Sequence, residues 1–104
     1  MSFKFETLII WQKSMEFGEN IHLLSKKFPK NEIFNHSSQI TRASYSIALN
    51  LAERVIGQNK PELFKFIGYS IRSFAEVVTC LYEAKNRKYL TKLVFQIFYK
   101  MIST

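Results

Sequence analysis

The 104-residue sequence contains no aspartate, a single cysteine, two prolines and three glycines. The lone Cys80 excludes an internal disulfide and is consistent with a reducing compartment. The longest uninterrupted apolar run, Leu8 to Trp11, is far shorter than the roughly 20 residues that a membrane-spanning helix needs. The N-terminus also lacks an apolar stretch of secretory length. We therefore expect a cytoplasmic protein without a membrane span.

Residues that build metal and enzyme sites are also scarce. His22 and His36 share no metal-ligand spacing with Cys80 or with a pair of carboxylates. The three glycines form no phosphate-binding loop, and no nucleophile stands in a pattern that would pair it with a base. We expect no metal, no cofactor and no catalytic activity.

Basic residues are abundant, and their distribution is uneven. Fifteen Lys and Arg against eight acidic residues give a net charge of +7, and no acidic residue follows Glu83. Such an excess favours polyanionic partners such as RNA, with Tyr82 and Tyr89 placed to stack on bases. The alternative is that these basic side chains are simply solvated and interact favourably with the C-terminal ends of the helices that they follow. The candidate nucleic-acid-binding residues are Lys85, Arg87, Lys88 and Lys92, with a secondary patch of Lys26, Lys27 and Lys30.

Apolar residues recur at helical spacing along the whole chain, and no strand alternation competes. The pattern predicts helices over residues 7–28, 36–56, 60–88 and 91–103. The first helix ends at Phe28-Pro29 and is followed by a polar link over residues 30–32, and the second stops at Gly57. The third helix starts with Asn59 as its cap and Pro61 in its first turn, and Thr91 caps the fourth after Tyr89-Leu90. Short links between helices favour antiparallel neighbours. We predict one all-α domain over residues 1–104, an antiparallel up-down four-helix bundle with a short fourth helix.

Two lines of residues at alternating spacings of three and four predict the buried faces of the first and third helices. The first line is Ile10, Ser14, Phe17, Ile21, Leu24 and Phe28, and the second is Phe64, Ile67, Ile71, Phe74, Val78 and Leu81.

The fourth helix is too short to cover its neighbours. Apolar surface on the first and third helices therefore needs another cover. Self-association is the simplest cover, and a truncated fourth helix would be the other explanation. With ten Phe and five Tyr in so small a chain, we expect some aromatic surface to lie between subunits.

The second helix has a polar row in place of an ordinary charged solvent face. Small or hydrogen-bonding groups at helical spacing indicate contacts between helices or subunits. We expect Arg42 to pair with Glu53 or Glu76. The candidate interface network is Gln39, Arg42, Ser46, Asn50 and Glu53, together with Ser73 and Glu76 of the third helix.

An ordered set of residues along nearly the whole chain carries a family resemblance. The set comprises Phe5 to Leu8, Trp11-Gln12, Phe28-Pro29, Glu32, Phe34, Gln39 to Ala43, Ser46-Ile47, Asn50 to Glu53, Phe64, Ser73, Glu76, Ala84 and Tyr89-Leu90. It resembles the bacterial four-helix bundle proteins encoded within intervening sequences of 23S ribosomal RNA genes, often described as S23-type ribosomal proteins.

The resemblance implies a cytoplasmic, non-enzymatic, all-helical protein that forms a ring-like homopentamer. The family is also similar to the accessory protein of diversity-generating retroelements, a basic pentameric barrel that binds a reverse transcriptase and nucleic acid. With the charge pattern, this favours an oligomeric bundle that binds RNA and is associated with 23S rRNA intervening sequences. The alternative is an adaptor that recruits a partner enzyme such as a polymerase or reverse transcriptase.

Three features depart from the family pattern. Arg54 stands where the family commonly has glycine, and Arg72 stands where it favours a small residue. If Arg72 faces a neighbouring helix, its guanidinium must reach solvent or a carboxylate. The family's last helix is usually longer and more acidic, so no C-terminal function is carried over.

Overall fold

The computed structural model describes residues 3–56 and 60–103, and within these ranges it contains helices and no strand. The four main helices are α1 (Ile9–Ser25), α2 (His36–Ile56), α3 (Lys60–Asn86) and α4 (Lys92–Ser103). Two short 3-10 helices, η1 (Lys4–Thr7) and η2 (Lys30–Glu32), precede α1 and α2. The prediction of an all-α fold with a short fourth helix is confirmed, since α4 has 12 residues and α3 has 27.

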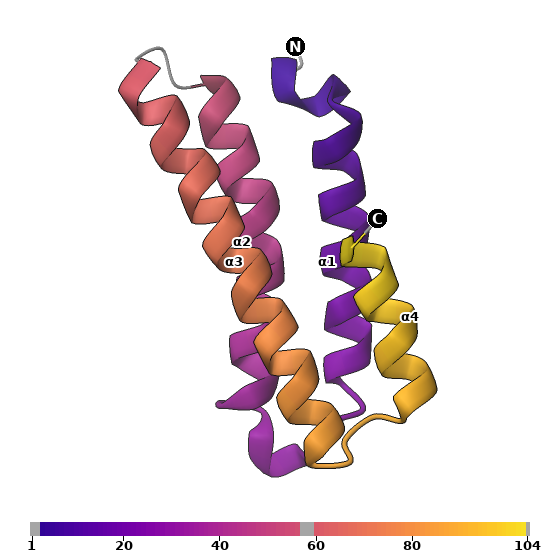
Figure 1. The fold of residues 1–104 in the computed structure, drawn as a ribbon. Helices are drawn as coiled ribbons and strands as arrows, with labels where there is room; N and C mark the ends of the chain where they lie inside the picture. The colour runs from indigo at the N-terminus through magenta and orange to yellow at the C-terminus, as the bar shows by residue number, and fades with distance from the viewer. Residues whose placement is uncertain (1–2, 57–59, 104) are drawn as a thin grey trace.

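Consecutive helices run in opposite directions (Figure 1). The helix α2 packs against both α1 and α3, and α4 packs against α3. The end of α1, the start of α2, the end of α3 and the start of α4 consequently lie at the same end of the molecule (Figure 1). This arrangement joins segments that are about 60 residues apart in the sequence.

The boundaries of α2 agree with the sequence prediction, whereas α1 is shorter at both ends. Before α1 the chain forms the separate 3-10 helix η1, in which the side chain of Glu6 accepts a hydrogen bond from the backbone N–H of Phe3 at 3.0 Å. At the end of α1, the hydroxyl of Ser25 bonds back to the carbonyl of His22 at 2.7 Å. A turn then leads to Pro29, whose extended backbone starts η2. Residues 30–32, predicted as a polar link, are therefore a 3-10 helix.

The helix α4 begins as the sequence predicts, with Thr91 as its N-cap. The Thr91 hydroxyl accepts a hydrogen bond from the backbone N–H of Val94 at 3.2 Å. The helix α3 ends at Asn86, two residues earlier than predicted. The predicted stop at Gly57 and cap at Asn59 lie outside the described residues.

The buried face of α3 differs from the predicted line. Leu81 is fully buried, but Ile71 is 63% exposed, and the side chains of Phe64 and Ile67 lie outside those described. Small side chains allow two helix backbones to approach closely, so a line of mostly small residues faces α2 and the larger Ile71 is left outside. That buried line, at strict spacings of three and four, is Ser70, Ser73, Val77, Cys80 and Ala84.

The contact between α1 and α2 depends on a glycine. Gly18 is buried, and a Cβ atom at this position would lie 3.0 Å from two ring carbons of Tyr45 on α2. The phenol of Tyr45 in turn donates a hydrogen bond to Glu19 at 2.9 Å. The bare backbone of Gly18 thus lets the Tyr45 ring cross the α1 surface and reach Glu19.

Within the described residues, no helix is both long enough and apolar enough to cross a membrane.

Candidate nucleic-acid interface

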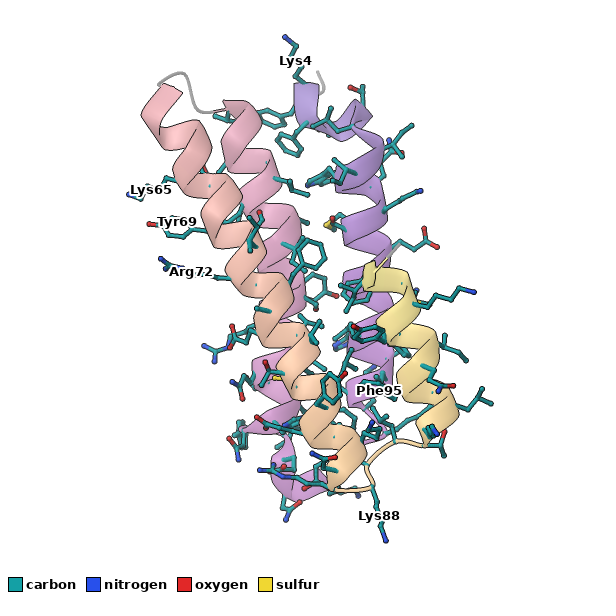
Figure 2. The ribbon with its side chains drawn as sticks, viewed as in Figure 1. Lys4, Lys65, Tyr69, Arg72, Lys88 and Phe95 are labelled. Carbon is teal, nitrogen blue, oxygen red and sulfur yellow. The ribbon has the colours of Figure 1, made fainter. Side chains whose placement is uncertain are left out.

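The two predicted basic patches lie at one end of the bundle. The Lys26 to Lys30 segment follows α1, and the Lys85 to Lys92 segment spans the link between α3 and α4, so both occupy the end where Lys88 extends away from the protein (Figures 1 and 2). We call this surface the basic end. It comprises Lys26, Lys27, Lys30, Lys85, Arg87, Lys88 and Lys92.

Two residues of the basic end are engaged in packing. The ammonium of Lys85 lies 4.4 Å from the ring centroid of Phe95 and 5.1 Å from that of Tyr82. The guanidinium of Arg87 lies 3.2 Å from a carboxylate oxygen of Glu32. Lys85 therefore joins α3 to α4, and the half-exposed Arg87 ties the end of α3 to η2. The other five members of the basic end are exposed to solvent and have no such role in packing here.

Glu32 ties the link after α1 to the end of α3. Its side chain is 9% exposed, and besides Arg87 it accepts hydrogen bonds from the Tyr89 phenol at 3.0 Å and the Asn35 amide at 3.3 Å. Partial burial raises the pKa of the Tyr89 phenol, as does the hydrogen bond to Glu32, so the phenol stays protonated and remains a donor. The buried carboxylate is thus compensated by one cation and two neutral donors.

Tyr89 is not available to stack on bases as the sequence analysis expected. Its ring lies 5.6 Å from Phe28 and 5.9 Å from the buried His36 between ring centroids. The Tyr82 ring packs edge-on against Phe95 at 4.8 Å. Tyr89 therefore serves the internal packing of this end, whereas Tyr82 contacts Phe95 and is still 43% exposed.

A groove beside the basic end supplies an aromatic surface that sequence reasoning missed. It has a volume of about 530 Å³ and lies between the end of α1, the η2 link and the start of α2. Phe34 is 94% exposed and Ile33 is 60% exposed. The sequence did contain a signal for it: Ile33 and Phe34 are apolar, yet they belong to neither of the predicted helices on either side of them. The groove is lined by His22, Ser25, Lys26, Phe28, Pro29, Lys30, Ile33, Phe34, Ser37, Ser38, Thr41 and Arg42.

The predicted polar network lies largely between α2 and α3 of the same chain. The hydroxyls of Ser46 and Ser73 share a hydrogen bond, and the Gln39 amide donates to Glu76 at 3.3 Å. The Asn50 amide donates to the Ser46 carbonyl at 2.7 Å. The side chains that join α2 to α3 are therefore those of Gln39, Ser46, Ser73 and Glu76. The contact of Asn50 lies within α2.

Arg42 and Glu53 are both exposed. Within the described residues Arg87 forms an ion pair with Glu32, and Nδ1 of His36 lies 3.5 Å from Glu83, whereas the expected pairing of Arg42 with Glu53 or Glu76 is not formed. Arg42 lines the groove instead.

Arg72 lies on the outer side of α3, where Lys65, Tyr69 and Arg72 extend away from the bundle (Figure 2). Its guanidinium lies 5.5 Å from the ring centroid of Tyr69. The guanidinium therefore reaches solvent and does not disturb helix packing. The side chain of Arg54, the other departure from the family pattern, lies outside those described.

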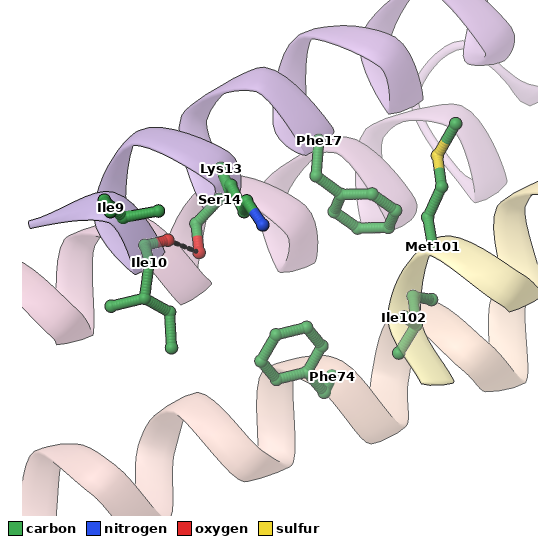
Figure 3. Close-up of a pocket in the computed structure, with 8 residues that line it drawn as sticks. All are labelled: Ile9, Ile10, Lys13, Ser14, Phe17, Phe74, Met101 and Ile102. Atoms are coloured by element: carbon green, nitrogen blue, oxygen red, sulfur yellow. Dashed lines mark hydrogen bonds between the residues drawn. The ribbon is translucent and has the colours of Figure 1, made fainter. Parts of the chain in front are cut away.

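An apolar trough opens where α4 stops short of the first turns of α1 (Figure 3). Its volume is about 730 Å³. At its rim, Ile10 is 58% exposed and Ile9 is 68% exposed, so the predicted burial of Ile10 is wrong for the chain by itself. The reason is that no helix within residues 3–56 and 60–103 covers that side of α1. The lining residues are Ile9, Ile10, Lys13, Ser14, Phe17, Phe74, Met101 and Ile102.

The described residues offer no cluster of three or more His, Cys or acidic side chains that could hold a metal. Cys80 is 1% exposed, and burial, with smaller contributions from Glu83 and Glu76, raises its pKa to about 11. A buried thiol that stays protonated at neutral pH is a packing residue, because nucleophilic and metal-binding cysteines act as thiolates.

The profile of one protein family, described as 23S rRNA-intervening sequence protein, matches residues 6–104. The match therefore covers the end of η1, all four main helices and both segments of the basic end. No curated protein showed significant similarity to the chain.

Proposed function

The chain belongs to the 23S rRNA-intervening sequence protein family, and from this premise we propose that it is a non-enzymatic, cytoplasmic, RNA-associated protein that works as a homo-oligomer. The observation that carries the RNA part is the basic end. Five exposed lysines from two distant segments share one end of the bundle, and the buried Glu32 carboxylate at this end is paired with Arg87.

Electrostatic attraction explains how such a surface would bind RNA. A nucleic-acid backbone carries one charge per phosphate, and each lysine that contacts a phosphate releases a condensed counterion. Such binding needs no defined pocket, and it weakens steeply as salt is added. The exposed lysines of the basic end meet this requirement.

The first prediction concerns salt dependence. The triple variant Lys27→Gln, Lys88→Gln, Lys92→Gln changes exposed side chains outside the groove and leaves Lys85 and Arg87 in place. Binding of single-stranded RNA, measured by fluorescence anisotropy from 50 to 300 mM salt, should weaken about tenfold at low salt. The slope of log K against log[salt] should become shallower by roughly 0.7 for each lost phosphate contact.

The matched control is Lys4→Gln, Lys65→Gln, Arg72→Gln, which removes the same charge from exposed side chains outside the basic end, the groove and the apolar trough. Equal losses in the two triple variants would mean that only net charge matters. Absence of RNA binding by the unaltered protein at 50 mM salt would refute the RNA part of the proposal.

The apolar trough supports a second part of the proposal, self-association, with five copies as the number that the family resemblance implies. An exposed apolar surface of this kind is typical of protein interfaces. The same surface favours the second candidate function, an adaptor that recruits a partner enzyme. Affinity for a protein partner that is insensitive to salt, in a protein that remains a monomer, would favour the adaptor.

A further inference from the structure

The groove beside the basic end combines an exposed aromatic ring with cationic side chains, and the function proposed above does not by itself require such a combination. Phosphate attraction needs only charge. Phe34 is the most exposed large apolar side chain among the described residues, at 94%. A phenylalanine in that position is in contact with water and contributes little to the fold, so the chain gains nothing from it as a monomer.

The lining of the groove is complementary to a nucleotide. Lys26, Lys30 and Arg42 supply cations, and the lining contains no carboxylate. Ser38 adds a hydroxyl. The hydroxyl of Ser37 donates to the Ser25 carbonyl at 3.4 Å, which fixes the start of α2 against the end of α1. The groove therefore combines hydroxyl groups, cationic side chains and an exposed aromatic ring.

We propose that this groove binds an unpaired nucleotide of single-stranded RNA, with the base stacked on Phe34 and the adjoining phosphates against Lys26, Lys30 and Arg42. This inference rests on the RNA-binding function proposed above and adds to it a preference for unpaired over duplex RNA. Bases in a duplex are stacked on each other and cannot present a face to a protein side chain, whereas unpaired bases can. Stacking tolerates every base, so the preference is for single strands and not for a sequence.

The test compares binding of one 12-nucleotide RNA, single-stranded and annealed to its complement, by the unaltered protein and by Phe34→Ala. The unaltered protein should bind the single strand more tightly. Phe34→Ala should bind the single strand about tenfold more weakly, a loss expected for one stacked base, and the duplex within twofold of the unaltered protein. Phe34→Trp should keep the preference for the single strand, because it retains an aromatic face.

The matched control is Leu93→Ala, which removes an exposed apolar side chain next to Lys92 and outside the groove. It should bind both RNAs as the unaltered protein does. The double variant Lys26→Gln, Arg42→Gln should make single-strand binding less dependent on salt. The slope of log K against log[salt] should become shallower by roughly 0.7 for each cation removed.

Two results would overturn the inference while leaving the proposed function in place. One is salt-dependent RNA binding that Phe34→Ala and Leu93→Ala change equally. The other is a loss of oligomeric mass in Phe34→Ala, measured by light scattering, which would assign Phe34 to a subunit interface. Absence of binding to either RNA by the unaltered protein at low salt would overturn the inference and the proposed function together.

Discussion

Glu32 is the residue that organises the basic end. It was expected in a polar link, yet it is buried and accepts hydrogen bonds from Arg87, Tyr89 and Asn35. Removing Arg87 would leave the buried carboxylate with two neutral donors and no cation, a loss that solvent reduces because Arg87 is half-exposed. Arg87 is therefore needed for the structure of the surface on which the exposed lysines lie. This is why the RNA experiments above leave Arg87 unchanged.

Cys80 provides a prediction on reactivity. Its thiol is 1% exposed and has a pKa of about 11. In the folded protein at pH 8 it should react with a thiol reagent at least 100-fold more slowly than in denaturant, because both access and the thiolate fraction are reduced. Rapid labelling of the folded protein would show that the α2–α3 contact opens readily.

The same raised pKa predicts how stability depends on pH. The unfolded thiol has a pKa of 9.0 and the folded thiol about 11, so the folded state retains the proton to higher pH. The resulting stabilisation is fully present below pH 9 and is lost as pH rises through 11. The unfolding free energy of the unaltered protein should fall by on the order of 2 kcal/mol more than that of Cys80→Ala over this interval. Parallel pH profiles of the two proteins would contradict the raised pKa.

At the scale of elements, the end of α3 has a helix-stop geometry that usually contains glycine. Lys88 has a φ of 62°, in the left-handed region. The backbone N–H of Tyr89 donates to the Ala84 carbonyl at 2.8 Å, and that of Lys88 donates to the Lys85 carbonyl at 3.0 Å. This is the Schellman arrangement, which turns the chain sharply toward α4. A side chain in the left-handed region is strained, so Lys88 occupies this place at a cost in stability.

Replacing Lys88 by glycine should therefore stabilise the protein. Glycine adopts a positive φ without strain, although it also adds freedom to the unfolded chain, and the expected net gain is about 0.5–1 kcal/mol in the free energy of unfolding. Chemical denaturation measures it. Lys88→Ala is the control, because it removes the same charge and keeps the Cβ atom. Equal stability of the two variants would show that strain at this position is negligible.

The pairing of α2 with α3 explains why the predicted buried line of α3 was displaced. Periodicity identified large apolar residues at a helical spacing, and it assigned Ile71 to the core. The small line through Ser73 and Cys80 has the same periodicity and faces α2, where the Ser46–Ser73 hydrogen bond requires close backbones. Hydrophobic spacing alone does not decide between two such faces, because the choice depends on the distance between helices.

At the scale of the whole molecule, the short α4 leaves apolar surface uncovered. The trough between α1, α3 and α4 and the exposed Ile71 are consistent with the sequence-based expectation that the first and third helices need a cover. Self-association stays a prediction. A second copy would remove this surface from water, and each fully buried isoleucine would contribute roughly 1.5–3 kcal/mol.

The corresponding experiment measures the mass in solution. Light scattering of the unaltered protein at micromolar concentration should give several times the chain mass of 12.3 kDa. Ile10→Lys, which places a charge at the rim of the trough, should shift the protein to monomers while it remains folded. Leu23→Lys is the control, since Leu23 is equally exposed on α1 and does not line the trough. A monodisperse monomer of the unaltered protein would contradict self-association.

The sequence alone determined the helices, their order, the short final helix and the positions of the basic residues, because periodicity, caps and charge are local properties of the chain. Tertiary structure decided which residues share a surface. It brought Arg87 and Tyr89 to the buried Glu32, assigned Lys85 to a packing contact, and left Phe34 exposed beside Lys26, Lys30 and Arg42. The two contacts to Glu32 join residues 55 and 57 positions apart in the sequence, and their formation depends on how whole helices pack.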